Sequence, residues 1–306
     1  MAAKSEDAWL FLVEYYDPMP KLTRKYLLKY FVDIHHVEMV DIVSKKLFLK
    51  KSPCPPEVTE RDFFIGGKLL LYSRELTIVD YGDAKTRNKL SKQTQKSMLI
   101  LPSEAFNSWG HVIDAVTSEF SLIAMQTVNI PPSVSDSIVE LLQESPKMAS
   151  VLSENACLIV MVHGGKGASG LAALCSELSG RHNCAIITPS DSNQFTQLHS
   201  NVLRKVMQNT TAVLSHCTCC VVKPHAVKRG AAGAVISQII TEGYDISAIS
   251  TIQFDRTTAE EFLEVYKGVI PDYVDHSVQL CSGISVAIEV RAQEDAVYSF
   301  RYVILY

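Results

Sequence analysis

Short apolar stretches separated by turn residues fill the first eighty positions of the chain. The stretch WLFLVEYY (9–16) is followed by Asp17-Pro18, a common turn dipeptide, and Gly66-Gly67 precedes two later apolar segments. Several short strands at this spacing predict a small β barrel or sandwich. The expected strands cover residues 9–16, 25–31, 37–42, 46–50, 68–72 and 76–81.

The next segment, from Asp83 to Gln95, is polar and basic and indicates a domain boundary. Its basic residues, together with one just beyond it, are Lys85, Arg87, Lys89, Lys92 and Lys96. Two interpretations are open, a solvated linker, which is the simpler one, and a surface that docks an acidic partner.

The rest of the chain contains a diverged internal repeat. Residues 97–105 (SMLILPSEA) and 219–227 (CCVVKPHAV) each combine a short apolar strand with a proline. Each is followed by a helical pattern with four apolar positions on one face. These positions are Val112, Ile113, Val116 and Phe120 in the first copy, and Val235, Ile236, Ile239 and Ile240 in the second.

Two further strands recur in each copy. Residues 119–125 correspond to 242–249, and residues 157–162 correspond to 285–290. The order strand, helix, strand, helix, strand predicts a ferredoxin-like unit, an antiparallel sheet with helices on one face. We therefore predict an α+β protein with an N-terminal β module followed by two ferredoxin-like domains, the second incomplete. The predicted domains are 1–90, 97–212 and 216–306.

Composition removes several classes of protein. The 47% of apolar and 20% of charged residues exclude a largely disordered chain, a collagen and a coiled-coil rod. No apolar run reaches the roughly 18 residues of a spanning helix, and the polar start is not a signal peptide. The 8 cysteines are expected to be reduced thiols in a cytosolic compartment.

Two parts of the sequence carry a family resemblance. Residues 221–249 (VVKPHAVKRGAAGAVISQIITEGYDISAI) resemble the opening of a nucleoside diphosphate kinase domain, which has a strand, Lys-Pro-Asp, a glycine loop and a helix. The N-terminal blocks EYYDPMPKLTRKYLLKYF, VEMVD, FLKK and DFFIGGKLLLYSRELTIVDYGD resemble the DM-ten domain, a pleckstrin-homology-like β module of axonemal proteins. The resemblance covers nearly the whole chain and is strong for 9–83 and 217–290.

This resemblance implies a particular chemistry. Family members transfer a γ-phosphoryl group through a phosphohistidine in a ping-pong reaction. A lysine and arginines neutralise the phosphates, with Mg²⁺ and ATP as ligands. The histidine lies in an Asn-x-x-His-Gly-Ser-Asp-Ser motif.

The first repeat departs from that motif. Leu101 stands at the lysine position, Thr188 at the histidine position and His199 at that of the family glutamate. A threonine hydroxyl cannot replace imidazole as a phosphoryl carrier near neutral pH. We therefore expect Leu101 and Thr188 to be degenerate positions, and we interpret the retained Ser190-Asp191-Ser192 as a turn.

The second repeat keeps Lys223 at the lysine position, which makes it the candidate nucleotide-binding residue. His225 replaces the family aspartate and is interpreted as a surface-loop histidine. Leu263 and Pro271 stand where the family has a tyrosine and a base-stacking phenylalanine. The chain reaches Tyr306 before any segment with the histidine motif, so we expect a truncated repeat and no catalytic residue.

Two other motifs favour structural roles. The glycine-rich HGGKGASG (163–170) lacks the order of a phosphate-binding loop and is expected to join a strand to a helix. Cys217-Thr218-Cys219-Cys220 has no second cysteine pair at ligand spacing, so we expect no metal site. These cysteines are interpreted as small apolar residues in a buried strand.

Taken together, the resemblance predicts a microtubule-associated structural or scaffold protein of the cytoplasm, the cytoskeleton and the ciliary axoneme. Its N-terminal module would bind a microtubule or axonemal proteins, without DNA or membrane partners. The alternative is a nucleoside diphosphate kinase that transfers the γ-phosphate of ATP to nucleoside diphosphates. A third possibility is retained nucleotide binding through Lys223 without transfer. No cofactor is assigned otherwise, and ATP with Mg²⁺ would be the ligands if binding is retained.

Overall fold

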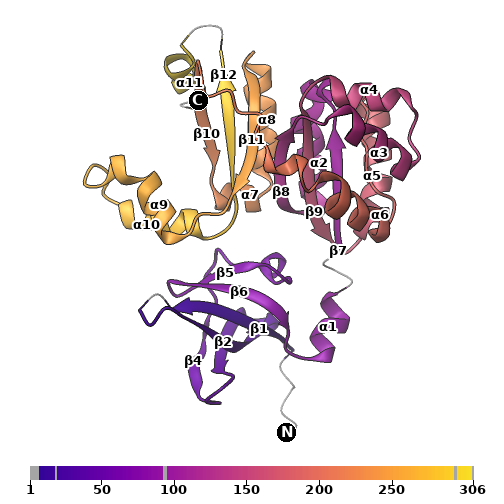
Figure 1. The fold of residues 1–306 in the computed structure, drawn as a ribbon. Coiled ribbons are helices and arrows are strands. Elements are labelled where there is room, and N and C mark those ends of the chain that lie inside the picture. Colours follow the sequence, from indigo (N-terminus) through magenta and orange to yellow (C-terminus); the bar gives the residue numbers. More distant parts are fainter. Residues whose placement is uncertain (1–6, 18, 92–94, 293–294, 305–306) are drawn as a thin grey trace. The chain divides into compact units, whose positions relative to one another are not determined.

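The computed structural model describes residues 7–17, 19–91, 95–292 and 295–304 (Figure 1). The chain groups into two compact units. The first contains Met1–Thr94 and Phe254–Gly283, and the second contains Gln95–Gln253 and Ile284–Tyr306. Both repeats contribute strands to the sheet of the second unit, whereas residues 254–283 of the second repeat group with the first unit. Within the described residues, no helix is both long and apolar enough to span a membrane.

The first unit contains a six-stranded antiparallel sheet in the order β4-β3-β2-β1-β6-β5. The apolar side chains of alternate residues form its core, as Trp9, Phe11 and Val13 do in the first strand. Tyr30 and Phe63 stack there with ring centroids 4.3 Å apart. The strands are β1 (Ala8–Asp17), β2 (Leu22–Phe31), β3 (His36–Asp41), β4 (Leu47–Pro53), β5 (Lys68–Leu71) and β6 (Arg74–Tyr81), with short helices η1 (Val32–Ile34) and η2 (Glu60–Asp62).

The segment interpreted as a linker is largely helical. Helix α1 (Ala84–Leu90) begins at Asp83, whose carboxylate accepts a hydrogen bond from the Thr86 backbone amide at 2.7 Å. Thr86 and Leu90 are buried, and the Thr86 hydroxyl accepts a 2.9 Å hydrogen bond from the Leu10 amide. The linker interpretation is therefore wrong for residues 84–90, because two buried side chains four residues apart hold this helix on β1.

Residues 254–283 form a helical segment of the first unit. It comprises α9 (Arg256–Phe262), η6 (Glu264–Tyr266) and α10 (Tyr273–Cys281). Leu263 is buried at the end of α9, whereas Pro271 is exposed. The small core of this segment consists of Phe254, Ala259, Leu263, Leu280 and Cys281.

The second unit also has a six-stranded antiparallel sheet, in the order β10-β12-β11-β8-β9-β7. The first repeat supplies β7 (Gln95–Leu101), β8 (Ser121–Val128) and β9 (Cys157–Gly164), and the second supplies β10 (Cys217–Val222), β11 (Asp245–Ile252) and β12 (Ser285–Arg291). The repeats meet at β8 and β11, where Ser250 pairs with Gln126. The predicted strands are present, and the α+β class with antiparallel sheets is confirmed.

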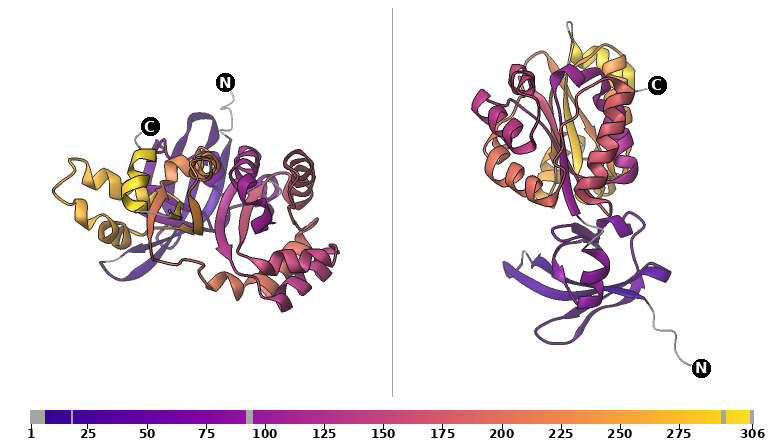
Figure 2. Two further views of the ribbon diagram at one scale, coloured as in Figure 1. Left: turned by 90° about the horizontal axis from the view of Figure 1, so that it is seen from above. Right: turned by 90° about the vertical axis from the view of Figure 1, so that its right-hand side faces the viewer.

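Helices cover the sheet on both faces over the first repeat (Figure 2). The expectation of helices on one face is wrong there, because alternate residues of β7 are apolar on both sides. Leu99 and Leu101 join one core, and Met98 and Ile100 join the other. The helices of the whole second unit are η3 (Ser103–Ser108), α2 (Trp109–Glu119), α3 (Pro132–Leu142), α4 (Lys147–Glu154), α5 (Gly167–His182), α6 (Ser192–Gln197), η4 (Leu198–Leu203), η5 (Val206–Gln208), α7 (Pro224–Lys228), α8 (Ala231–Thr241) and α11 (Ala296–Ile304).

The two repeats also meet where α2 and α8 cross. A Cβ placed on Gly233 would lie 2.4 Å from the Asp114 amide nitrogen and 2.6 Å from the Gly110 carbonyl oxygen. A Cβ on Gly110 would lie 2.6 Å from the Gly233 carbonyl oxygen. Both glycines therefore allow a backbone approach that a side chain would block. Each glycine lies two residues before one of the Val-Ile pairs that the repeat pattern predicts on the apolar face of a helix.

Candidate functional site

Lys223 lies where β10 ends and α7 begins. Its carbonyl oxygen accepts hydrogen bonds from the Ala226 and Val227 amides at 2.9 and 3.0 Å, and Pro224 occupies the first helical position. The Lys223 side chain is half-buried. His225 is exposed, as expected, but it lies in α7 rather than in a loop. The sequence therefore located a strand-to-helix junction correctly, with one basic side chain at its start.

Leu101 occupies the corresponding place in the first repeat. It ends β7 and is fully buried in the core beneath α2 and α5. A buried leucine offers no charge to a phosphate, and its contribution is to packing.

Thr188 is also held close to β7. Ile187 forms an isolated antiparallel bridge with Ile100, and the Thr188 hydroxyl donates a 2.8 Å hydrogen bond to the Met98 carbonyl oxygen. The Thr188 side chain therefore helps to fix this segment at the sheet edge. Asp191 then caps α6, since one of its carboxylate oxygens accepts from the Asn193 and Gln194 amides, each at 2.8 Å.

The candidate residues do not meet at one place. Lys223 follows β10 and Thr188 is bonded to β7, and these two strands are the opposite edges of the sheet. Leu101 faces the core rather than Thr188. His199 stacks on Phe195 with ring centroids 5.7 Å apart, and burial, then the charges of Lys96 and Arg204, lowers its pKa. The candidate residues of a phosphate site therefore lie apart in the sheet, and no catalytic step with ATP and Mg²⁺ follows from their positions.

The cysteine strand requires a correction. β10 is an edge strand, so Cys219 is exposed and Cys217 and Cys220 are half-buried, rather than all lying in a buried strand. Burial raises the pKa of Cys220 to about 11. No group of three or more His, Cys, Asp or Glu side chains that could hold a metal ion occurs among the described residues.

The glycine-rich segment joins β9 to α5, as the sequence predicted. β9 ends at Gly164, and Gly167, with φ +57°, opens α5. Lys166 forms an ion pair with Glu119 at 2.5 Å. The lysine of the glycine-rich segment thus forms an ion pair within the second unit.

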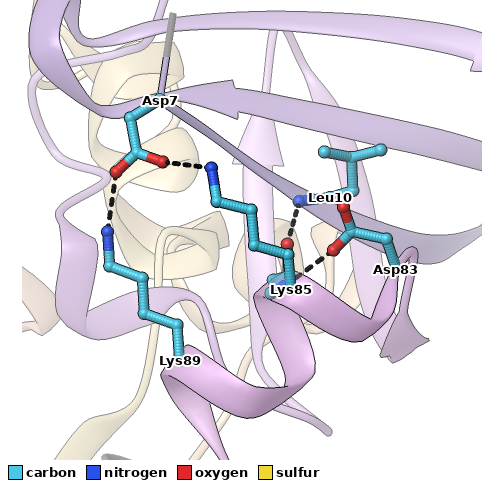
Figure 3. Close-up of polar contacts among 6 residues, drawn as sticks. Asp7, Leu10, Asp83, Lys85 and Lys89 are labelled. Carbon is cyan, nitrogen blue, oxygen red and sulfur yellow. Dashed lines mark hydrogen bonds and ion pairs between the residues drawn. The ribbon is translucent and has the colours of Figure 1, made fainter. Parts of the chain in front are cut away.

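Most of the basic stretch after the β module is also used internally. Lys85 and Lys89 of α1 both point toward Asp7 and bind it at 2.9 and 2.7 Å (Figure 3). Hydrogen bonds from Lys89, then from Lys85, lower the pKa of Asp7 to about 2. Arg87 pairs with Asp80 at 3.0 Å. Lys96 lies in β7, and Lys92 lies outside the described residues.

A buried carboxylate that the sequence did not single out links three segments of the second unit. Glu289 of β12 is 8% exposed and accepts hydrogen bonds from the Val213 amide, the Leu214 amide and the Ser247 hydroxyl at 2.8, 2.6 and 2.8 Å. Burial alone would raise the pKa of Glu289, but these bonds and one from Cys217 outweigh it and lower that pKa. Glu289 therefore fixes the connection between the two repeats to the sheet.

Comparison with known proteins supports the resemblance. Residues 216–304 match the family model described as "Nucleoside diphosphate kinase". The chain is 28% identical to "Nucleoside diphosphate kinase homolog 7" of Rattus norvegicus over 98% of its own length and 82% of the relative's. The chain thus resembles nucleoside diphosphate kinase homolog 7 almost from end to end. The Mus musculus protein of the same name gives the same identity and coverage.

Other nucleoside diphosphate kinases match a smaller share of the chain. A nucleoside diphosphate kinase of Sorangium cellulosum is 30% identical over 28% of this chain and 59% of its own length. A solved nucleoside diphosphate kinase from Aquifex aeolicus covers 35% of this chain and 92% of its own, with 12% identity and a TM-score of 0.31. The sequence matches therefore show that this chain is similar to nucleoside diphosphate kinases.

Proposed function

We propose that this chain is a microtubule-associated scaffold of the ciliary axoneme, in which the kinase-like repeats are catalytically degenerate. In this proposal the first unit's β module is a DM-ten domain with the pleckstrin-homology-like fold, and it docks the protein in the cytoskeleton. The observation that carries the degeneracy is Thr188, whose hydroxyl is bonded to the Met98 carbonyl oxygen at the position of the family's phosphorylated histidine. The fusion of both repeats into one sheet supports a packing role for them.

Binding to microtubules tests the docking part directly. The purified 306-residue chain is expected to pellet with polymerised microtubules and to stay in the supernatant without them. Weaker pelleting in high salt is expected as well, because exposed charges are screened. If the protein stays soluble at all microtubule concentrations, the docking proposal is wrong.

Phosphoryl transfer is the alternative function. Incubation with γ-labelled ATP and Mg²⁺ is expected to give no acid-labile phosphoenzyme, whereas an active bacterial nucleoside diphosphate kinase treated alongside becomes labelled. Labelling that persists in Thr188→Ala and His225→Ala variants would place an active site elsewhere in the chain. Binding of Mg²⁺-ATP to the parent and to Lys223→Ala, measured in the same samples, separates retained binding from transfer.

A further inference from the structure

Two hairpin turns of the first unit lie at the same end of its sheet. The turn between β1 and β2 ends at Lys21, and the turn between β3 and β4 covers residues 42–46. Near their bases Tyr26 pairs with Asp41, and the Ile42 amide donates to the Lys25 carbonyl oxygen at 3.2 Å. The two turns are therefore neighbours, although about twenty residues separate them in sequence.

Exposed apolar side chains occur at both turns. Met19 is 92% exposed and Val43 is 88% exposed, while Leu22 and Leu47, at the starts of the strands that follow, are each about half exposed. Single exposed apolar residues are common on protein surfaces, whereas several of them at two neighbouring turns favour an interaction site.

The same turns carry three exposed lysines. Lys21, Lys45 and Lys46 are exposed and form no ion pair within the described part of the chain. Nearby Arg24 and Lys25 differ, because they bind Asp17 and Glu14. The surface therefore has a local excess of positive charge.

The acidic residue beside the second turn, Asp41, forms hydrogen bonds within that turn. Asp41 accepts hydrogen bonds from the Ser44 and Val43 amides at 2.6 and 2.9 Å, and from the Ser44 hydroxyl. The Ser44 backbone bond is the largest influence that lowers the pKa of Asp41, so this carboxylate remains charged while it shapes the turn. It does not pair with Lys45 or Lys46 in the structure.

Backbone conformation gives an independent indication. Lys21 has φ +52° and Lys45 has φ +57°, in the left-handed region that glycine and asparagine occupy most readily. Such a conformation costs about 1 kcal/mol or more for a residue with a side chain. Both turns thus hold a long basic side chain where glycine or asparagine would be more stable, a pattern found at functional sites.

An exposed aromatic ring follows the second turn. Phe48, which is 42% exposed, packs on the buried Tyr26 with ring centroids 4.4 Å apart and the ring planes tilted, and the Arg74 guanidinium lies 5.2 Å from the centre of the Phe48 ring. Aromatic residues, methionine and arginine are enriched where proteins bind one another.

We propose that this hairpin-tip surface docks an acidic polypeptide segment that also carries apolar side chains. The surface consists of Met19, Lys21, Leu22, Val43, Lys45, Lys46, Leu47 and Phe48. The proposal rests on the docking role proposed for the first unit and names the part of it that makes contact. Charge complementarity selects an acidic segment, and the bare side chains select apolar contacts beside it. An anionic bilayer fits less well, because lipid-binding clusters hold about four to eight basic residues.

Charge reversal of the 306-residue chain tests the surface. The variant Lys21→Glu, Lys45→Glu, Lys46→Glu is expected to bind a fluorescent peptide of alternating glutamate and leucine at least about tenfold more weakly than the parent. The matched control Lys147→Glu, Lys205→Glu, Lys267→Glu changes three other exposed lysines by the same total charge and should bind like the parent. Met19→Ser with Val43→Ser is expected to weaken binding without changing the salt dependence.

Four outcomes decide the matter. Equal peptide binding by the charge-reversed variant and its control would overturn the inference, and so would binding of phosphatidylserine vesicles in preference to the peptide. Microtubule pelleting that survives charge reversal would overturn it while leaving the proposed docking function intact. Lysine-dependent peptide binding by a protein that does not pellet with microtubules would support the surface and refute the axonemal role. Because all the altered side chains are exposed, the urea unfolding midpoints of the serine and glutamate variants are expected to equal that of the parent. Equal midpoints exclude misfolding as the cause of weaker binding.

Discussion

Replacing Gly233 by alanine is expected to destabilise the second unit by about 3 kcal/mol, at the upper end of the usual range for overpacking. The added Cβ would meet the Asp114 amide nitrogen at 2.4 Å and the Gly110 carbonyl oxygen at 2.6 Å. Both are backbone atoms, so no side-chain rotation relieves the clash. Helices α2 and α8 would have to separate, which would open the core that they share.

Gly180 provides the matched control. It also lies in a helix, α5, but a Cβ placed there has no neighbouring atom within 4 Å. Gly180→Ala is therefore expected to stabilise the protein by roughly 0.5–1 kcal/mol, the intrinsic difference between the two residues in a helix. Urea unfolding followed by circular dichroism measures both changes. Shifts of the same sign would contradict the close helix crossing.

The elements of this fold could be predicted because local periodicity carries their signal. The apolar stretch 9–16, bounded by turn residues, identified a strand, and the shared Val-Ile pairs after Gly110 and Gly233 identified matching helices. The single sheet could not be predicted in the same way. The pairing of β8 with β11 and the crossing of α2 with α8 depend on residues more than a hundred positions apart, which no periodic pattern records.

The same reasoning explains what was missed around the candidate site. Lys223 could be singled out only through the family resemblance, which has a lysine where an apolar strand ends. Helix α1 was missed because its basic residues dominate the composition, although Asp83 as a cap and the spacing of Thr86 and Leu90 were readable signals. The cysteines of β10 were thought buried because alternation does not tell an edge strand from a central one.

Glu289→Gln is the second substitution with a large expected effect, about 2–3 kcal/mol of destabilisation at neutral pH. The carboxylate accepts from the Val213 and Leu214 amides through its two separate oxygens. A glutamine would direct its amide group, a donor, at one of those N–H groups. Because the site is 8% exposed, water cannot readily replace the lost acceptor.

The pH dependence distinguishes this buried carboxylate from an ordinary packing residue. The pKa of Glu289 is lower in the folded chain than in the unfolded chain, so its stabilisation is complete above the unfolded value of about 4.3 and is lost as pH falls through the folded value. The stability difference between parent and Glu289→Gln should therefore shrink below about pH 4.3. Glu154→Gln, at an exposed position of α4, should leave stability nearly unchanged throughout. A parent–variant difference that stays constant from neutral to acidic pH would mean that the charge of Glu289 does not hold the connection between the repeats.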